Sequence, residues 1–279
     1  MIDYQDPKAL LRTLEQRARR RFGQHFLTRP DLVERMVERA GVTRGSRVVE
    51  IGPGLGILTQ ALVTAGAEVT AVEVDRDLAE HIRGHFSQVQ LVEQDATRVD
   101  WAALCPGEGW RVVANLPYNV GTNLIVELLR HSLRFTSVTV MLQKEVVKRF
   151  LAEAGSDAYG SLSVYVQSRA RGYWLFEVPP GCFYPPPKVD SVVVRLEPLP
   201  EPLVGPAGED NFDRVVRAAF AQRRKTITNS LTTVYERDTV LQALQSVGIS
   251  PTIRAEMLEI EAFRALAAAL HPAGRGESS

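Results

Sequence analysis

The sequence predicts an α/β fold built on a largely parallel sheet, with a small all-helical domain at its C-terminal end. Between residues 47 and 142, short runs rich in β-branched residues alternate with amphipathic segments, which is the pattern of βαβ units. After a proline-containing stretch at 197–210, the pattern is helical only. We therefore expect a first domain at residues 1–200 and a second at 208–279, ending in a disordered tail.

Composition limits the classes of function. The chain has 279 residues, 45% of them hydrophobic, and a formal net charge of zero. No whole-molecule field attracts nucleic acid, so contact with a polyanion requires local basic clusters. Two cysteines, Cys105 and Cys182, indicate a reduced, cytoplasmic protein rather than a disulfide scaffold. We see no secretory signal and no apolar run near the roughly 20 residues that span a bilayer, so no membrane partner is expected.

The N-terminal segment is basic and leads into the first helix. Residues 8–21 are rich in arginine and include Arg20 and Arg21, so they form either a solvated helix face or a contact for phosphates. A loop with apolar anchors follows at 23–27. Thr28 is expected to cap the next helix, because an acid follows three residues later and an apolar stripe continues to residue 40.

Polar side chains follow three neighbouring strands of the expected sheet. The strand 68–74 carries Glu73 at its end, the strand 89–93 is followed by Asp95, and the strand 110–114 by Asn115. The carboxyl ends of parallel strands meet at one edge of a sheet, where ligands bind. A carboxylate at this edge can accept hydrogen bonds from ribose hydroxyls or from an adenine amine. Together the three side chains predict a nucleoside pocket.

The strand 47–51 runs into a glycine turn that opens the helix 57–65. Gly52, Gly54 and Gly56 let the backbone pass close to a ligand without a Cβ in the way. The dinucleotide fingerprint is G-x-G-x-x-G, whereas here the third glycine comes one residue early and Ile57 takes its expected place. This spacing disfavours a nicotinamide oxidoreductase, which is the nearest alternative for such a turn.

The tetrapeptide Asn115-Leu116-Pro117-Tyr118 suits an aromatic amine. The Asn115 amide and the Leu116 carbonyl offer acceptors, and Tyr118 offers a flat apolar face. Pro117 cannot extend the ladder, so the strand ends here. Two acceptors beside an aromatic ring are what an aromatic amine, such as the 6-amino group of adenine, requires.

The remaining elements complete the expected architecture. Further helices are predicted at 76–86, 123–130, 144–154, 161–170, 212–221, 225–235, 239–247 and 262–270, and further strands at 137–142, 173–178 and 191–196. A stiff proline-rich loop, 179–188, separates the last two strands. His81 and His85 share a helix face without a third ligand, so we expect a solvated face and no metal site. Arg223, Arg224 and Lys225 form a basic cluster at a helix junction.

The motifs together resemble a known family. Residues 49–56 look like the S-adenosylmethionine loop of class I methyltransferases, and Asn115 to Tyr118 resembles the adenine-amino methyltransferase signature. With residues 23–27 and 183–191, the chain resembles the small-subunit ribosomal RNA adenine dimethyltransferases over roughly residues 20–235. The resemblance implies a Rossmann-like class I methyltransferase sheet and S-adenosylmethionine as cofactor. It implies cofactor contacts at His25, Leu27, Gly52, Glu73, Asp95 and Asn115. We add Gly54 of the glycine turn to these expected cofactor contacts.

The resemblance also implies the reaction. Methyl groups would pass to the 6-amino groups of two adjacent adenosines in a hairpin loop near the 3′ end of small-subunit rRNA, within an immature ribosomal subunit. Tyr118 and Phe183 would lie around the target base, and residues 1–27 would form a basic arm and cofactor lid. The arginine-rich start and the cluster at 223–225 would contact the RNA backbone, and the protein would act as a monomer. The family commonly has Asn where this chain has His25.

Two further alternatives share this fold. One is a large-subunit rRNA adenine methyltransferase of the macrolide-resistance type, and the other is a non-catalytic rRNA-binding assembly factor. The proline run before Ser191 and the residues 119–122 favour the small-subunit enzyme. The intact glycine turn and Asn115 disfavour a protein that only binds.

Overall fold

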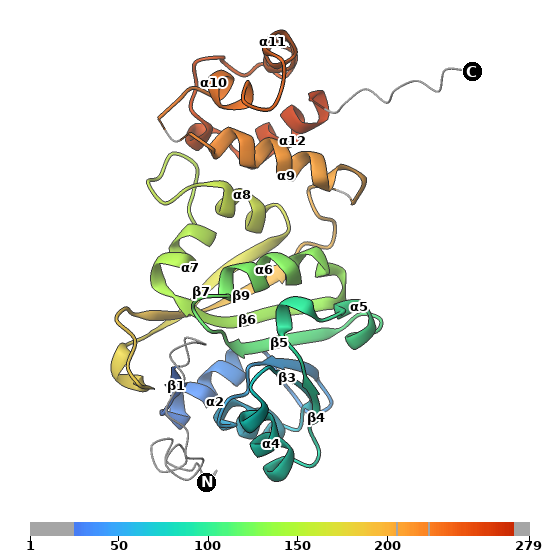
Figure 1. Cartoon of the computed structure of the whole chain (residues 1–279), viewed down its shortest axis with the longest axis vertical. Coiled ribbons are helices and arrows are strands. Elements are labelled where there is room, and N and C mark those ends of the chain that lie inside the picture. Colours follow the sequence, from blue (N-terminus) through green and yellow to red (C-terminus); the bar gives the residue numbers. More distant parts are fainter. Residues whose placement is uncertain (1–24, 205, 223, 271–279) are drawn as a thin grey trace, which may run out of the picture. The chain divides into compact units, whose positions relative to one another are not determined.

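The computed structural model describes residues 25–204, 206–222 and 224–270 (Figure 1). The chain divides into two compact units, one with residues up to 147 and 172–198, the other with 148–171 and the residues from 199 onward. Residues 148–171 thus group with the C-terminal helices, although the sequence pattern places them before the boundary. Within the described residues, no helix is long and apolar enough to cross a bilayer.

The first unit is organised on a seven-stranded sheet with the order β4-β3-β2-β5-β6-β9-β7. The strands β2 to β6 pair in parallel, whereas β9 is antiparallel to β6. This is the predicted α/β fold. The strands are β2 (Arg47–Ile51), β3 (Glu68–Glu73), β4 (Gln90–Glu93), β5 (Trp110–Asn115), β6 (Phe135–Gln143), β7 (Ala170–Val178) and β9 (Ser191–Pro198).

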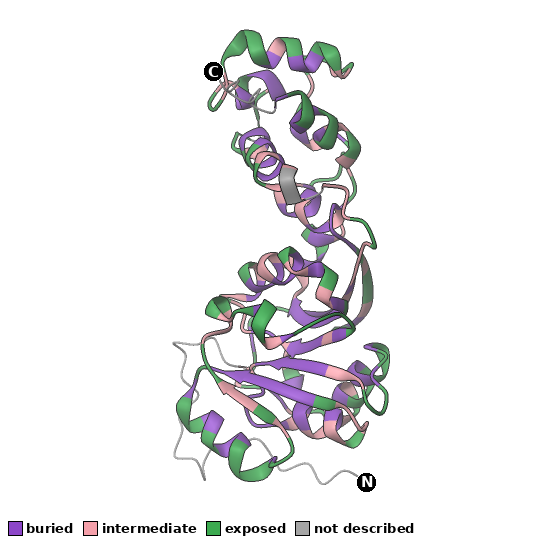
Figure 2. Ribbon diagram, turned by 90° about the vertical axis from the view of Figure 1, so that its right-hand side faces the viewer, coloured by how far each residue is buried: buried purple, intermediate pink, exposed green. Residues whose placement is uncertain are grey.

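Both faces of the sheet are buried. On one face, Met36 and Leu62 from two helices pack in one core with strand residues such as Val113. Because side chains alternate along a strand, Val112 and Val140 point to the opposite face, and they too are fully buried. Figure 2 shows this burial along the strands. The helices of this unit are α2 (Pro30–Arg39), α3 (Ile57–Thr64), α4 (Arg76–His85), α5 (Trp101–Leu104), α6 (Gly121–Arg130) and the start of α7 (Lys144–Phe150).

A second, two-stranded sheet forms beside the large one, and sequence patterns did not predict it. β1 (Phe26–Leu27) pairs antiparallel with β8 (Phe183–Tyr184), with Phe26 opposite Tyr184. The expected cap role of Thr28 is wrong: Arg29 precedes α2, and the Thr28 hydroxyl instead donates to the Cys182 carbonyl over 3.0 Å. The small sheet therefore fixes the start of the chain to the proline-rich loop.

The second unit is helical, as the sequence predicts. Its helices are α8 (Ser161–Gln167), α9 (Pro206–Phe220), α10 (Ile227–Leu231), α11 (Arg237–Ser246) and α12 (Ile260–Ala269). Phe212 and Phe263 centre one core, which Tyr159 and Val164 join from the 148–171 segment. That shared core explains why this segment belongs to the second unit.

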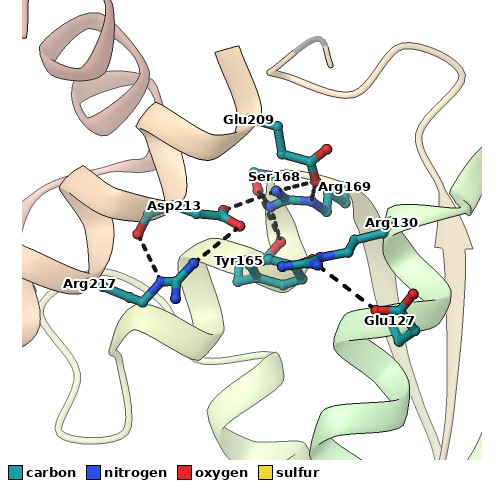
Figure 3. A network of polar contacts seen from close by, with 8 residues as sticks. All are labelled: Glu127, Arg130, Tyr165, Ser168, Arg169, Glu209, Asp213 and Arg217. Carbon is teal, nitrogen blue, oxygen red and sulfur yellow. Dashed lines mark hydrogen bonds and ion pairs between the residues drawn. The ribbon is translucent and has the colours of Figure 1, made fainter. Parts of the chain in front are cut away.

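An arginine network ties α8 to α9 within the second unit (Figure 3). The buried guanidinium of Arg169 lies 2.7 Å from the Glu209 carboxylate and 3.0 Å from that of Asp213. It also lies over the Tyr165 ring, 3.8 Å from the ring centroid. Burial raises the pKa of Asp213, although the charge of Arg169 opposes this shift. The network thus holds buried charge in pairs.

Candidate active site

A cavity of about 200 Å³ lies at the carboxyl ends of the parallel strands in the first unit. Its lining brings together residues from the small sheet, the glycine turn and the ends of β3, β4 and β5, as expected for an open α/β sheet. Most of the predicted site residues line this one cavity: His25, Leu27, Gly52, Gly54, Glu73, Asp95, Asn115, Leu116 and Tyr118. Phe183 is not among them.

The three glycines of the turn have different roles. All three have positive φ angles, +67° at Gly52, +57° at Gly54 and +84° at Gly56, which residues with a side chain rarely adopt. A Cβ on Gly52 would meet nothing within 4 Å, so the missing side chain leaves open space at the cavity wall. A Cβ on Gly56 would lie 2.5 Å from the Phe86 ring. Gly52 therefore leaves room for a ligand, whereas Gly56 permits tight packing.

Glu73 is buried, and its carboxylate is held by backbone groups. The Gly54 N–H donates to Oε2 over 3.2 Å, and the Val74 and Asp75 N–H groups both donate to Oε1 over 3.0 Å. Burial raises the pKa of Glu73, and these backbone donors oppose the shift. The glycine turn and the end of β3 are thereby fixed to each other.

Glu50 also lines the cavity, and sequence reasoning did not select it. Its side chain on β2 is fully buried; Oε2 accepts a hydrogen bond from Thr59 Oγ1 over 2.7 Å, while Oε1 has no hydrogen-bond partner. Burial raises the pKa of Glu50 to about 8, and the charge of nearby Glu73 adds to the shift. An acid inside a buried apolar strand is rare, and that was the signal available in the sequence.

Asp95 follows β4 at the cavity edge. Its Oδ1 accepts from the Thr97 backbone N–H over 2.9 Å and from the Thr97 hydroxyl over 2.7 Å. These hydrogen bonds lower the pKa of Asp95, so its carboxylate stays ionised at neutral pH. A fixed carboxylate is thus available at the place where the sequence predicts an acceptor.

The orientation of the Asn115 amide follows from its partner. Asn115 Nδ2 lies 3.1 Å from the His25 carbonyl oxygen. A carbonyl can only accept, so the amide nitrogen must face it, and Oδ1 is the atom left for another group. The next residue, Leu116, is buried, and its N–H donates to the Met141 carbonyl. The end of β5 therefore presents an acceptor oxygen in the cavity lining.

Tyr118 is held at both ends of its ring. Its hydroxyl forms a hydrogen bond with Ser191, the first residue of β9, and its ring lies 5.2 Å from the His25 ring at an interplanar angle of 34°. Burial raises the pKa of the Tyr118 phenol, so it remains a neutral ring at physiological pH. Phe183, by contrast, is only 4% exposed and packs in the core with Leu27 and Met36.

The basic residues are divided by what the structure describes. Arg20, Arg21 and Arg223 lie outside the described residues. Arg224 and Lys225 are exposed between α9 and α10, in the second unit. The cluster thus offers exposed cations at a helix junction.

The expectation of a solvated histidine face is wrong for His81. Its side chain is buried, and the centroid of its ring lies 4.2 Å from the centroid of the His85 ring. Burial lowers the pKa of His81, while a hydrogen bond to the Leu55 backbone opposes the shift. His81 therefore packs behind the glycine turn. No cluster of three or more metal-binding side chains occurs in the described part of the chain.

The fold and the cavity are those of the Rossmann-like α/β class, and the family match makes this chain a methyltransferase of that class. A model of the family described as ribosomal RNA adenine dimethylase matches residues 15–271. The chain belongs to that family.

Relatives and solved structures agree with this assignment. A protein of Bordetella pertussis called ribosomal RNA small subunit methyltransferase A is 45% identical over 259 residues, covering 92% of this chain and 96% of the relative. Its namesake in Pseudomonas aeruginosa is 42% identical over 257 residues, covering 91% and 94%. A dimethyladenosine transferase structure from Plasmodium falciparum superposes with a TM-score of 0.74 at 25% identity, covering 87% and 96%. The structure of the 23S rRNA methyltransferase ErmE superposes with a TM-score of 0.65 at 26% identity, covering 88% of this chain and 100% of ErmE.

Proposed function

We propose that this protein transfers methyl groups from S-adenosylmethionine to the 6-amino groups of two adjacent adenosines in a hairpin loop near the 3′ end of small-subunit rRNA. The observation that carries the proposal is the Asn115 amide, whose Oδ1 is left as an acceptor in the cavity. The family and the names of the relatives support the rRNA substrate. Within this proposal, the protein acts as a monomer in the cytoplasm on an immature small subunit.

The lining of the cavity supports S-adenosylmethionine as the cofactor. Gly52 leaves open space where a side chain would stand, and the lining supplies both apolar walls and carboxylates. A carboxylate has about four lone-pair positions, of which the backbone takes three at Glu73, so capacity remains for a ribose hydroxyl. Asp95 would accept from the adenine amine of the cofactor. The full proposed set of contacts is His25, Leu27, Gly52, Gly54, Glu73, Asp95 and Asn115.

The chain's own residues then prepare the target amine. S-adenosylmethionine, when bound, supplies an electrophilic methyl group on a sulfonium. The adenine amine is a poor nucleophile, because its lone pair is delocalised into the ring. Asn115 Oδ1 and the Leu116 carbonyl would accept its two N–H groups and bias the nitrogen toward a tetrahedral geometry. This is positioning and electrostatic preorganisation, without a covalent intermediate on the protein.

The target base must leave its stack to reach the cavity. Tyr118 lines the cavity and offers the aromatic face, and such stacking contributes roughly 1–3 kcal/mol per base. We also propose Phe183 beside the base. Because its ring lies in the core with Leu27, that role requires the ring to turn out of the core.

RNA binding would use local clusters of positive charge, since the net charge of the chain is zero. The proposed contacts are Arg20 and Arg21 in the N-terminal arm, and Arg223, Arg224 and Lys225 at the helix junction. They would hold phosphates without reading sequence, while the cavity selects the base.

One assay tests the proposal. Purified protein and tritiated S-adenosylmethionine are incubated with immature small-subunit particles, naked small-subunit RNA and large-subunit RNA, and the modified nucleosides are identified. We expect dimethyladenosine in the small-subunit particles. Label in large-subunit RNA instead would indicate an activity like that named for ErmE. RNA binding without any transfer would indicate an assembly factor and contradict the proposal.

A further inference from the structure

His25 contacts three parts of the proposed adenine site. Its backbone carbonyl accepts from Asn115 Nδ2 over 3.1 Å. Its Nδ1 lies 2.7 Å from the Pro185 carbonyl oxygen, and its ring lies against that of Tyr118. A single residue therefore touches the acceptor amide, the aromatic face and the proline-rich loop.

The small sheet explains the direction of the His25 carbonyl. The Thr28 N–H donates to the Cys182 carbonyl, and the register places Phe26 opposite Tyr184. Hydrogen-bonded and non-hydrogen-bonded pairs alternate along an antiparallel ladder. Thr28 and Phe26 therefore occupy hydrogen-bonded positions, and His25 occupies a non-hydrogen-bonded one. Its backbone carbonyl is directed away from β8, which leaves it to Asn115.

The hydrogen bond between His25 Nδ1 and the Pro185 carbonyl determines the tautomer of the histidine ring. The Pro185 carbonyl can only accept, so His25 Nδ1 must carry the hydrogen and donate it. In the neutral ring, Nε2 is then the nitrogen without a hydrogen.

We propose that His25 is a positioning residue for the target adenine, acting through Nδ1–H on the Pro185 carbonyl and through its ring on Tyr118. The inference rests on the proposed function and deepens it. The same loop is fixed at its other end, where the Asp190 carbonyl accepts from the Lys144 N–H and Ser191 bonds the Tyr118 hydroxyl. His25 thus holds one side of the aromatic ring and Ser191 its tip. A cofactor contact by the His25 backbone is compatible with this role.

Two isosteric substitutions separate this role from others. An asparagine amide places its NH2 where Nδ1 stands in histidine, whereas the NH2 of glutamine reaches the position of Nε2. His25→Asn therefore keeps the donor to Pro185, and His25→Gln and His25→Ala lose it. We expect His25→Gln and His25→Ala to lower kcat about tenfold, the size of one neutral hydrogen bond. His25→Asn should stay within about threefold of the wild-type kcat, because only the ring contact is lost.

The experiment uses the full chain, small-subunit particles and tritiated S-adenosylmethionine, with cofactor affinity measured by calorimetry and folding by thermal denaturation. We expect kcat to fall in His25→Gln while the cofactor dissociation constant stays within about twofold. A dissociation constant that rises as much as kcat falls would make the side chain a cofactor ligand and overturn the inference. Equal losses in His25→Asn and His25→Gln would overturn it too, because the Nδ1 donor would then have no special role.

A second measurement is independent of activity. Long-range ¹⁵N–¹H spectra of the neutral His25 ring should show the hydrogen on Nδ1, and the tautomer with the hydrogen on Nε2 would overturn the inference. An inactive wild-type protein with the Nδ1–H tautomer would count against the proposed function alone. An active wild-type protein whose His25→Gln variant matches it would count against the positioning role alone.

Discussion

Replacing Asn115 by alanine tests the acceptor that carries the proposed function. The change removes Oδ1 from the cavity and also removes the Nδ2 donor to the His25 carbonyl. Loss of one preorganised hydrogen-bonding group at a reacting centre typically costs about 10²–10³ in kcat, or about 2.7–4 kcal/mol. Loss of the neutral hydrogen bond to His25 should lower the free energy of unfolding by about 1 kcal/mol. The expected effect on turnover therefore greatly exceeds that on stability.

Single-turnover transfer of tritium from S-adenosylmethionine to small-subunit particles measures the chemical step. Asn115→Ala should slow it by at least two orders of magnitude, while cofactor binding weakens less. Asn123→Ala is the matched control, because Asn123 is exposed on α6 and does not line the cavity. Near-normal transfer by Asn115→Ala would refute the assignment of Oδ1 as the acceptor.

Three further predictions concern packing, pH and salt. Gly56→Ala should lower the free energy of unfolding by about 2–4 kcal/mol in thermal denaturation, because its Cβ would meet the Phe86 ring at positive φ; an unchanged melting temperature would contradict the packing role. Burial raises the pKa of Glu50 from 4.5 to about 8. Between pH 4.5 and pH 8 the folded state keeps the Glu50 proton that the unfolded state has lost, so the free energy of unfolding should fall with rising pH by on the order of 3–5 kcal/mol. Urea unfolding at pH 5 and pH 8 measures this fall, which should be smaller in Glu50→Gln. Arg224→Ala and Lys225→Ala should each reduce the slope of log affinity for RNA against log salt by about 1; unchanged slopes would remove these residues from the interface.

The arrangement of the large sheet could be predicted because each strand carries its own local signal. Arg47–Ile51 is a short β-branched run that ends at a glycine, and its observed bounds match the predicted ones. Parallel pairing then puts the ends of β3, β4 and β5 at one edge, which is why the sequence predicts that Glu73, Asp95 and Asn115 meet in one pocket. Sequence spacing was sufficient here, since topology rather than side-chain packing determines which residues meet.

The rest of the site depends on contacts between distant segments. β1 and β8 have only two residues each and are separated by more than 150 positions, so neither gives a periodic signal. For the same reason, the local sequence predicts a helix cap at Thr28, whereas its hydroxyl donates to the Cys182 carbonyl. Phe183 shows the converse limit, because a motif names the residue but not whether its ring faces the cavity or the core. The local sequence thus predicts which residues end the strands, whereas tertiary packing determines which other side chains line the cavity.

The proposed acceptor geometry would also let one site act twice on a single nitrogen. After the first transfer the adenine amine keeps one N–H, so only one of the two proposed acceptors, Asn115 Oδ1 or the Leu116 carbonyl, would be needed to hold it. The other position must then accommodate a methyl group. The Asn115 amide is held by the His25 carbonyl, so the orientation of Oδ1 does not depend on the substrate. In the proposed site, an acceptor that the protein itself holds would remain in place for the second transfer, when the substrate offers one donor fewer.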